Sequence, residues 1–224
     1  MLNRLVAGSP LRKTRLHSQR GDFIPPGRLL RNGPKTLLHG LARVVLNIRQ
    51  PRPWISYDAQ AVIARHLGPE SHVLEFGSGM STAWYAERAA SVFSIDHVPE
   101  WFAKVSRAVP SNATVKLATT VEEYTDFPRR SYDLIMVDGT FRVPCVIAAL
   151  PHLAPGGIFY LDNSDRQGDY ADALELLLRY AEEHDCEVRR FTDFVTAQLF
   201  VEEGFMLRRA RGHTSPTARV FVAK

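Results

Sequence analysis

The chain has 224 residues, of which 45% are hydrophobic and 23% charged, a composition typical of a globular protein with one large core. No apolar run reaches the roughly 18–20 residues that a membrane-spanning helix needs, and the basic first twenty residues lack the apolar segment of a secretory signal. The two cysteines, Cys145 and Cys186, form no paired motif, so neither a disulfide framework nor a zinc site is indicated, and we expect a cytoplasmic protein.

The charge is divided unevenly along the chain. Residues 1–52 hold 11 Lys and Arg against one acid, a net charge of +10, whereas residues 53–224 hold 17 bases and 23 acids, a net charge of −6. We therefore divide the chain into a basic N-terminal extension, 1–52, and a folded domain, 53–224. The extension suits an anionic membrane surface, where the protein would be peripheral, or a polyanion such as RNA. Packing on the acidic body of its own or a neighbouring chain, as in an oligomer, and a solvated tail without a partner are the alternatives left open.

Within the extension, Gly and Pro predict that residues 1–35 are irregular. Residues 36–49 predict a short amphipathic helix that Pro51 and Pro53 end. Its apolar side consists of Leu37, Leu38, Leu41, Val44, Val45 and Ile48.

From residue 54 onward, apolar strands alternate with helices. A first helix, capped by Ser56 or Asp58, runs to Leu67. Strands are expected at 72–76, 91–96, 113–118, 132–138 and 156–162, and helices at 81–90, 98–109, 120–127, 143–153 and 170–184. This alternation predicts an α/β fold, a doubly wound and mostly parallel sheet with helices on both faces. After His184 the pattern predicts strands at 187–194, 196–209 and 218–224, with Gly204 in a turn, and hence an antiparallel C-terminal edge.

The stretch "VLEFGSGMST", residues 73–82, is the first candidate ligand site. Its strand ends at Phe76, which places Gly77 and Gly79 at the edge where doubly wound sheets bind ligands. Asp96 ends the next strand, 17 residues beyond Gly79, and can accept both hydroxyl hydrogens of an adenosine ribose. A dinucleotide site would need glycine at position 82, where Thr82 stands. The acid directly before the turn is also better suited to a cationic, amine-bearing ligand than to phosphates, so nicotinamide cofactors are disfavoured.

This stretch, together with "SIDH", "YDLIMVDG" and "LAPGGIFYLDN", resembles the class I S-adenosylmethionine-dependent methyltransferases, in particular bacterial O-methyltransferases of glycan and natural-product pathways. The resemblance covers about residues 54–200. It implies a seven-stranded, Rossmann-like sheet with one antiparallel strand, and S-adenosylmethionine over the glycine turn. The cofactor-binding residues it implies are Glu75, Gly77, Ser78, Gly79, Ser81, Thr82, Asp96, His97, Ala118, Thr119 and Asp138. Ser81 departs from the family, which has glycine there.

The candidate catalytic residues end the fourth and fifth strands. An oxygen nucleophile must lose a proton, either to a base or by binding a metal, and Asp138 and Asp162 are placed for this chemistry. With Asn163 they resemble the ligand set of the catechol O-methyltransferases, which implies Mg²⁺. Phe141 stands where those enzymes have a lysine base, so Asp138 as a metal-free base is the alternative. Acids and Asn also end strands and begin turns without a catalytic role.

Arg142 and Tyr57 are the candidate substrate residues. Arg142 follows the fourth strand and can grip an anion or a sugar, or else is a surface arginine that begins a helix. Tyr57, with Trp54, forms a lid wall or belongs to the core. "VDGTFR" stands where nucleic-acid amino-methylating enzymes have an Asp-Pro-Pro-Tyr-like stretch, which argues against methylation of exocyclic base amines.

The expected function is O-methylation of a small hydroxylated molecule or a sugar unit of a glycan. An RNA-modifying methyltransferase that uses residues 1–52 is one alternative, which steeply salt-dependent RNA binding would reveal. A non-catalytic interaction module of the same fold is the other, which failure to bind S-adenosylmethionine would favour.

Overall fold

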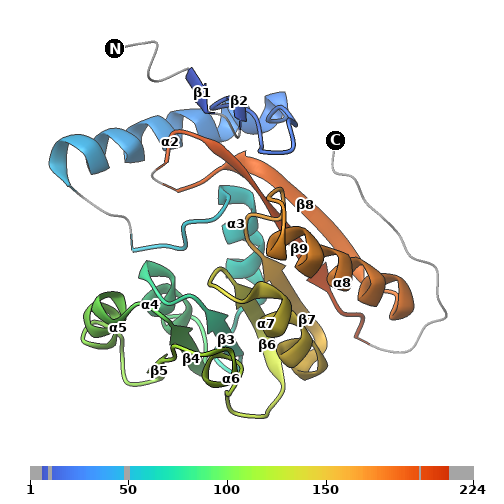
Figure 1. Cartoon of the computed structure of the whole chain (residues 1–224). Coiled ribbons are helices and arrows are strands. Elements are labelled where there is room, and N and C mark those ends of the chain that lie inside the picture. Colours follow the sequence, from blue (N-terminus) through green and yellow to red (C-terminus); the bar gives the residue numbers. More distant parts are fainter. Residues whose placement is uncertain (1–6, 10–11, 48–50, 197, 212–224) are drawn as a thin grey trace.

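A computed structural model describes residues 7–9, 12–47, 51–196 and 198–211. Its centre is a seven-stranded sheet in the order β5-β4-β3-β6-β7-β9-β8 (Figure 1). The strands are β3 (His72–Phe76), β4 (Ser91–Asp96), β5 (Ala113–Leu117), β6 (Tyr132–Val137), β7 (Leu153–Leu161), β8 (Glu187–Phe194) and β9 (Val201–Arg208). All neighbouring pairs are parallel except those that β9 makes with β7 and β8. The expected mostly parallel sheet with an antiparallel C-terminal edge is confirmed.

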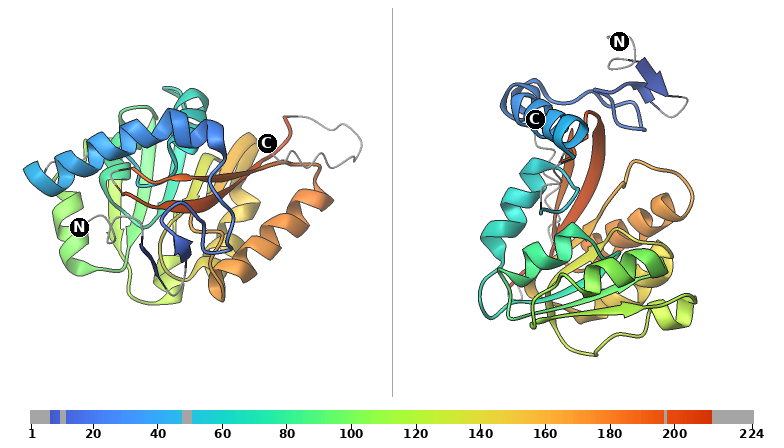
Figure 2. Two further views of the ribbon diagram at one scale, coloured as in Figure 1. Left: turned by 90° about the horizontal axis from the view of Figure 1, so that it is seen from above. Right: turned by 90° about the vertical axis from the view of Figure 1, so that its left-hand side faces the viewer.

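Helices cover both faces of the sheet (Figure 2). On one face, α3 (Tyr57–His66) and α4 (Met80–Ala86) enclose a core with side chains of β3, β6 and β7. On the other face, α6 (Val121–Tyr124), α7 (Arg142–Ala149) and α8 (Asp169–Glu183) enclose the larger core. A 3₁₀ turn, η1 (Leu150–His152), follows α7, and α5 (Pro99–Ser106) packs beside β4 and β5.

Local sequence signals account for several helix starts. The backbone N–H of Ala59 donates to the Ser56 hydroxyl at 3.1 Å, so Ser56 is the cap of α3. Pro99 occupies the first turn of α5, where its missing N–H costs nothing. Thr120 and Glu123 form a reciprocal capping box at α6.

The N-terminal part is more ordered than the sequence predicts. β1 (Ala7–Ser9) pairs antiparallel with β2 (Arg12–Thr14), and α2 begins at Pro26 and runs to Leu46. The expectation of irregular structure up to residue 35 is therefore wrong for these segments, because Pro26 fits the first helical turn and Asn32 is anchored by tertiary contacts. The expected helix end at 48–49 and the expected strand at 218–224 lie outside the described residues.

Two glycine positions also differ from expectation. Gly204 lies within β9, paired with Phe191, and not in a turn. A side chain there would collide with the Tyr160 hydroxyl, so glycine is required by close packing. β7 begins at Leu153, three residues before the strand expected at 156–162, and within it Gly156 has φ +81° and the pairing with β6 shifts register.

The predicted extension packs on the body. Ile24 is fully buried in a small core with Tyr57, Phe194 and Val201. Arg12 donates to Glu202 of β9 at 2.8 Å. The boundary at residue 52 remains a prediction. Among the described helices, none combines the length and the apolar character needed to cross a membrane.

Candidate cofactor and acceptor site

A pocket of about 300 Å³ opens at the carboxyl ends of β3, β4 and β6. Gly77 forms its floor with φ +100°, a conformation that favours glycine. A Cβ at Gly77 would lie 2.7 Å from the carbonyl oxygen of Asp138, so glycine lets the ends of β3 and β6 approach. The lining residues are Arg52, Trp54, Gly77, Ser78, Gly79, Met80, Ser81, Asp96, His97, Val98, Trp101, Asp138 and Gly139.

Glu75 lies beneath this turn and is fully buried. Its carboxylate accepts hydrogen bonds from the hydroxyls of Ser81, Thr82 (2.6 Å) and Ser94 (2.7 Å). Burial raises the pKa of Glu75 to about 7, although these three hydroxyls oppose the shift. The carboxyl group therefore fixes the start of α4 from below, on the protein side of the glycine turn.

Asp96 is placed as the sequence predicts, at the end of β4 and in the pocket wall. It is 4% exposed and accepts hydrogen bonds from the Ser78 hydroxyl at 2.7 Å and the Val98 N–H at 2.9 Å. Because a carboxylate has about four lone-pair sites, these two bonds leave capacity for a diol. His97 lies beside it, with Nδ1 4.0 Å from Asp96 Oδ1 and the side chain 46% exposed.

Not every predicted cofactor residue borders the pocket. Glu75 and Thr82 lie beneath the turn, and Ala118 is buried, with its N–H donating to the Asp96 carbonyl at 2.8 Å. Thr119 is exposed and its N–H donates to Glu123 at 2.8 Å. The roles of these residues stay predictions.

Trp101 is a wall residue that the sequence interpretation missed. Its indole Nε1 donates to the Ser78 carbonyl at 2.5 Å and lies 3.7 Å from where a Cβ at Gly79 would be. The sequence feature that could have indicated this wall residue is an aromatic residue in the first turn of the helix that follows Asp96. A large ring there closes one side of the pocket against water.

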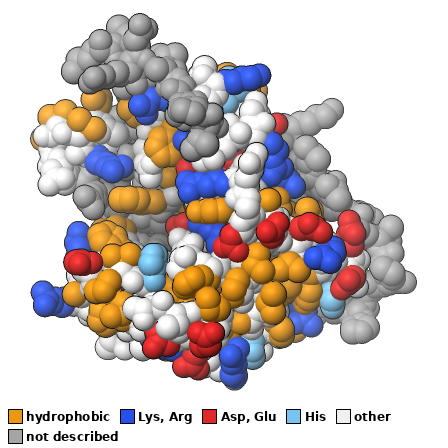
Figure 3. Space-filling view, in the orientation of Figure 1, with side chains coloured by type: hydrophobic (Ala, Val, Ile, Leu, Met, Phe, Trp, Pro, Cys, Tyr) orange, Lys and Arg blue, Asp and Glu red, His pale blue; other side chains and the backbone are white. Residues whose placement is uncertain are grey.

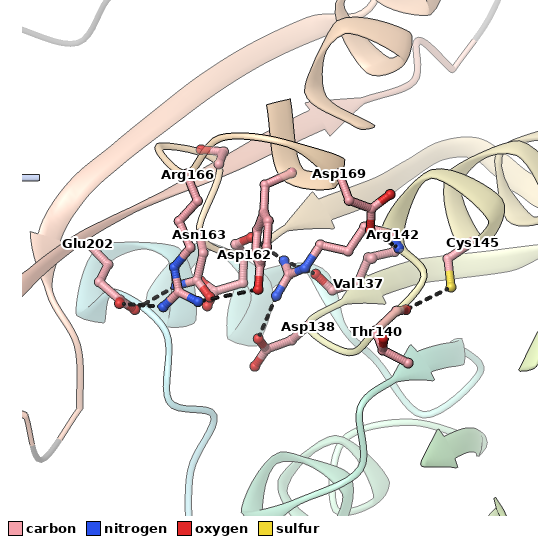
Figure 4. Close-up of polar contacts among 12 residues, drawn as sticks. Val137, Asp138, Thr140, Arg142, Cys145, Asp162, Asn163, Arg166, Asp169 and Glu202 are labelled. Carbon is pink, nitrogen blue, oxygen red and sulfur yellow. Dashed lines mark hydrogen bonds and ion pairs between the residues drawn. The ribbon is translucent and has the colours of Figure 1, made fainter. Parts of the chain in front are cut away.

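Two carboxyl groups, those of Asp138 and Asp162, follow the ends of β6 and β7, with the Arg142 guanidinium beside Asp138 (Figure 4). Asp162 is 4% exposed, and burial together with the charges of Asp138 and Glu202 raises its pKa well above the usual range. Asp138 borders the pocket, and 36% of its side chain is exposed. Loss of solvation of its carboxyl group raises the pKa of Asp138, whereas the positive charge of Arg142 lowers it. The two carboxyl groups influence each other, because the charge of Asp138 raises the pKa of Asp162 whereas Asp162 lowers that of Asp138.

Two arginines accompany this pair. Arg142 is buried, its guanidinium donates to the carbonyls of Val137 (3.3 Å) and Asp162, and it lies 3.4 Å from Asp138 Oδ1. Arg142 therefore begins α7 as expected but is not a surface arginine.

Arg166 pairs at 3.0 Å with Glu202, which also accepts from the Asn163 side chain at 2.6 Å (Figure 4). Sequence reasoning missed Glu202, because β9 is brought to this edge only by the fold.

The donor set does not fit the predicted Mg²⁺ ion. Asp138, Asp162 and Asn163 do come from neighbouring strand ends, but the Arg142 guanidinium already lies against the Asp138 carboxylate and the Asp162 carbonyl. The Asn163 amide is turned toward Glu202 as a donor. Among the residues that the structure describes, there is no group of three His, Cys, Asp or Glu placed to hold a metal ion.

Of the two aromatic residues proposed as a lid wall, Trp54 lines the pocket and Tyr57 does not. Tyr57 is 8% exposed, packs with Ile24, and its hydroxyl lies 2.9 Å from His39 Nδ1. The structure thus places Tyr57 in a small core beneath α2.

Residues 74–164 match a family model described as a methyltransferase domain. Comparison with curated protein sequences gives no significant match.

Among solved structures, the chain is similar to the O-methyltransferase TomG from Streptomyces achromogenes, involved in tomaymycin synthesis and solved with S-adenosylmethionine (12% identity, TM-score 0.57, 82% of this chain and 96% of that chain). It is also similar to an O-methyltransferase from Bacillus cereus solved with S-adenosylhomocysteine (14%, 0.56, 78% and 90%). A third similar structure is an rRNA methylase from Streptococcus thermophilus (16%, 0.55, 73% and 98%).

Residues 74–164 thus match a methyltransferase domain, and the chain has the Rossmann-like α/β fold of the O-methyltransferases that were solved with S-adenosylmethionine or S-adenosylhomocysteine. The pocket lining is chemically compatible with S-adenosylmethionine, since the Asp96 carboxylate would suit a ribose diol, the Trp101 ring would form an apolar wall, and the Asp138 carboxylate would suit a cationic centre. The acceptor is a separate question.

Proposed function

We propose that the protein methylates a hydroxyl group of a small hydroxylated molecule or a sugar unit of a glycan, with Asp138 as the general base. The observation that carries this proposal is the Asp138 carboxylate at the pocket edge, which lies 3.4 Å from the Arg142 guanidinium and beside the buried carboxyl group of Asp162. Bound S-adenosylmethionine supplies an electrophilic methyl group. The protein aligns the acceptor with it and removes the acceptor's proton.

Each residue has a defined task in this proposal. Asp96 binds the ribose hydroxyls, and Trp101 excludes water from one side of the pocket. Asp138 takes the proton of the acceptor hydroxyl, and its raised pKa makes it a stronger base than an ordinary aspartate. Arg142 offsets the negative charge of the carboxyl pair, which is the task that a metal ion performs in other sites. We place this reaction in the cytoplasm, with residues 53–224 as the catalytic domain.

An RNA acceptor is the second candidate. The observation in its favour is a cavity of about 650 Å³ between α2, α3 and β8, which is lined by Arg28, Arg31, Lys35, Arg65, Arg189 and Arg190 against the acids Asp58 and Glu187. RNA binding at this cavity would be tight and steeply salt-dependent. The small-molecule or glycan acceptor is preferred because Asp138, the proposed base, lines the cofactor pocket itself.

Transfer of a tritiated methyl group to a panel of monosaccharides, catechols and RNA tests the function. Asp138→Asn keeps the size of the side chain but removes the base, so turnover should fall by about 10²–10⁴-fold. Asp193→Asn is the matched control, because Asp193 is also a buried aspartate with a raised pKa, about 6, but bonds to Asn32 far from the pocket. A full rate in Asp138→Asn would remove Asp138 from the mechanism.

A further inference from the structure

Helix α2 turns its apolar side away from the protein. Six aliphatic residues repeat along one side of it and are 52–79% exposed: Leu30, Leu37, Leu38, Leu41, Val44 and Val45. The residues buried against the body are Asn32, Thr36 and Gly40, which are polar or small. A surface helix ordinarily buries its apolar side, so this arrangement is reversed.

Specific contacts hold the helix in this orientation. The Asn32 amide donates to Asp193 at 2.7 Å, and Gly40 lets the backbone approach Leu199, 3.2 Å from where a Cβ would lie. Arg28 pairs with Asp58 at 3.1 Å. Rotating α2 to bury its leucines would break the contacts of Asn32 with Asp193 and of Arg28 with Asp58. These contacts therefore keep the apolar side of the helix exposed to solvent.

Positive charge accompanies the apolar side. α2 contains Arg28, Arg31, Lys35 and Arg43 and no acidic residue. The basic cavity between α2, α3 and β8 adds Arg65, Arg189 and Arg190 along one flank of the helix. In the space-filling view, some hydrophobic and some basic side chains are visible in the region of α2, at the upper left (Figure 3). An aliphatic stripe bordered by cations is the pattern of a helix that lies in a membrane interface.

We propose that α2 docks the protein on an anionic lipid bilayer, with the aliphatic stripe in the headgroup–acyl boundary and the flanking cations against lipid phosphates. A second copy fits less well, because a two-fold contact between α2 helices would bring the exposed cations Arg31 and Lys35 of two acid-free helices together. RNA would neutralise the cations but leave the aliphatic stripe in water. The bilayer is the partner that satisfies both features.

Docking would also place the cofactor pocket close to the lipid. The Arg43 guanidinium lies 5.1 Å from the centroid of the Trp54 ring, and Trp54 lines the pocket. The inference does not depend on the proposed acceptor, because vesicle binding requires no catalysis.

Co-sedimentation of the full-length protein with vesicles tests this inference. Vesicles of phosphatidylcholine containing phosphatidylglycerol should bind the protein, pure phosphatidylcholine vesicles should bind it far less, and added NaCl should weaken binding. The double variant Leu41→Asp, Val45→Asp should bind at least about tenfold less. Ile147→Asp is the matched control, because Ile147 is also an exposed aliphatic residue (61%) but lies on α7, and its binding should be unchanged.

Thermal unfolding and cofactor calorimetry on each variant show whether it is folded, since both replaced leucine and valine side chains point into solvent. Four results would overturn the proposal. The protein could fail to bind anionic vesicles, or the double variant could bind them as well as the control does. Light scattering could instead show a dimer that the double variant dissociates, with no vesicle binding, which would make the stripe an interface between copies. RNA retention without vesicle binding would assign the cations to RNA.

Discussion

Gly77 allows a quantitative test of how closely β3 and β6 meet at the pocket. Gly77→Ala combines two costs, because the residue has φ +100° and its new Cβ would lie 2.7 Å from the Asp138 carbonyl oxygen. The positive φ costs a non-glycine residue roughly 1–2 kcal/mol. Forcing a methyl group against fixed backbone adds about 1–3 kcal/mol. The total is about 2–5 kcal/mol, or a fall in Tm of roughly 5–15 °C for a chain of this length.

Two other glycines separate these costs. Gly21 has φ +98° with nothing within 4 Å of its Cβ position, so Gly21→Ala reports the backbone cost alone. Gly79 has extended φ, and its Cβ would make only ordinary contacts, the nearest at 3.6 Å with the Ser81 hydroxyl. Gly79→Ala should therefore leave the stability nearly unchanged.

Calorimetric unfolding of the three variants is the assay. We expect the loss of stability to be largest in Gly77→Ala, intermediate in Gly21→Ala and smallest in Gly79→Ala. If Gly77→Ala unfolds at the same temperature as Gly21→Ala, the close approach between the turn and Asp138 does not exist, and the description of the pocket floor is wrong.

Two further predictions concern charge at the site. Burial raises the pKa of Glu75 in the folded state from 4.5 to about 7, so the folded state holds the Glu75 proton more tightly than the unfolded state does. The contribution of protonated Glu75 to the free energy of unfolding is therefore complete below pH 4.5, falls as the pH rises from 4.5 to 7, and is absent above pH 7. Relative to Glu75→Gln, the free energy of unfolding should fall by about 3 kcal/mol across this pH range, which denaturant unfolding of both proteins at several pH values would measure. If the difference in unfolding free energy between the two proteins stays constant with pH, the raised pKa of Glu75 is contradicted. Methyl transfer should be unchanged after dialysis against EDTA, because Arg142 provides the positive charge beside Asp138; a loss of activity that Mg²⁺ restores would refute this.

The sequence was sufficient to predict the sheet because strands buried on both faces, such as β6 and the second half of β7, are continuously apolar. It was also sufficient to place Asp96 at the pocket, because an acid that ends a parallel strand must lie at the ligand edge.

Contacts between distant segments could not be predicted in this way. The burial of Arg142 depends on the carbonyls of two strands, and Glu202 reaches the carboxyl pair from β9. The orientation of α2 was also hidden, because its apolar periodicity predicts the helix but not that its polar side is the buried one. These features follow from which polar groups find partners across the fold.

Calorimetric titration of the full-length protein with S-adenosylmethionine tests the central claim most directly. We predict one binding site per chain, and affinity weakened by about 1.5–3 kcal/mol in Asp96→Ala through loss of the charge-assisted acceptor. Asp126→Ala, which removes an exposed aspartate paired with Lys116, should bind as the unchanged protein does. No binding by the folded protein would contradict the account and favour a non-catalytic module, and equal affinity in a folded Asp96→Ala variant would remove the ribose site from this pocket.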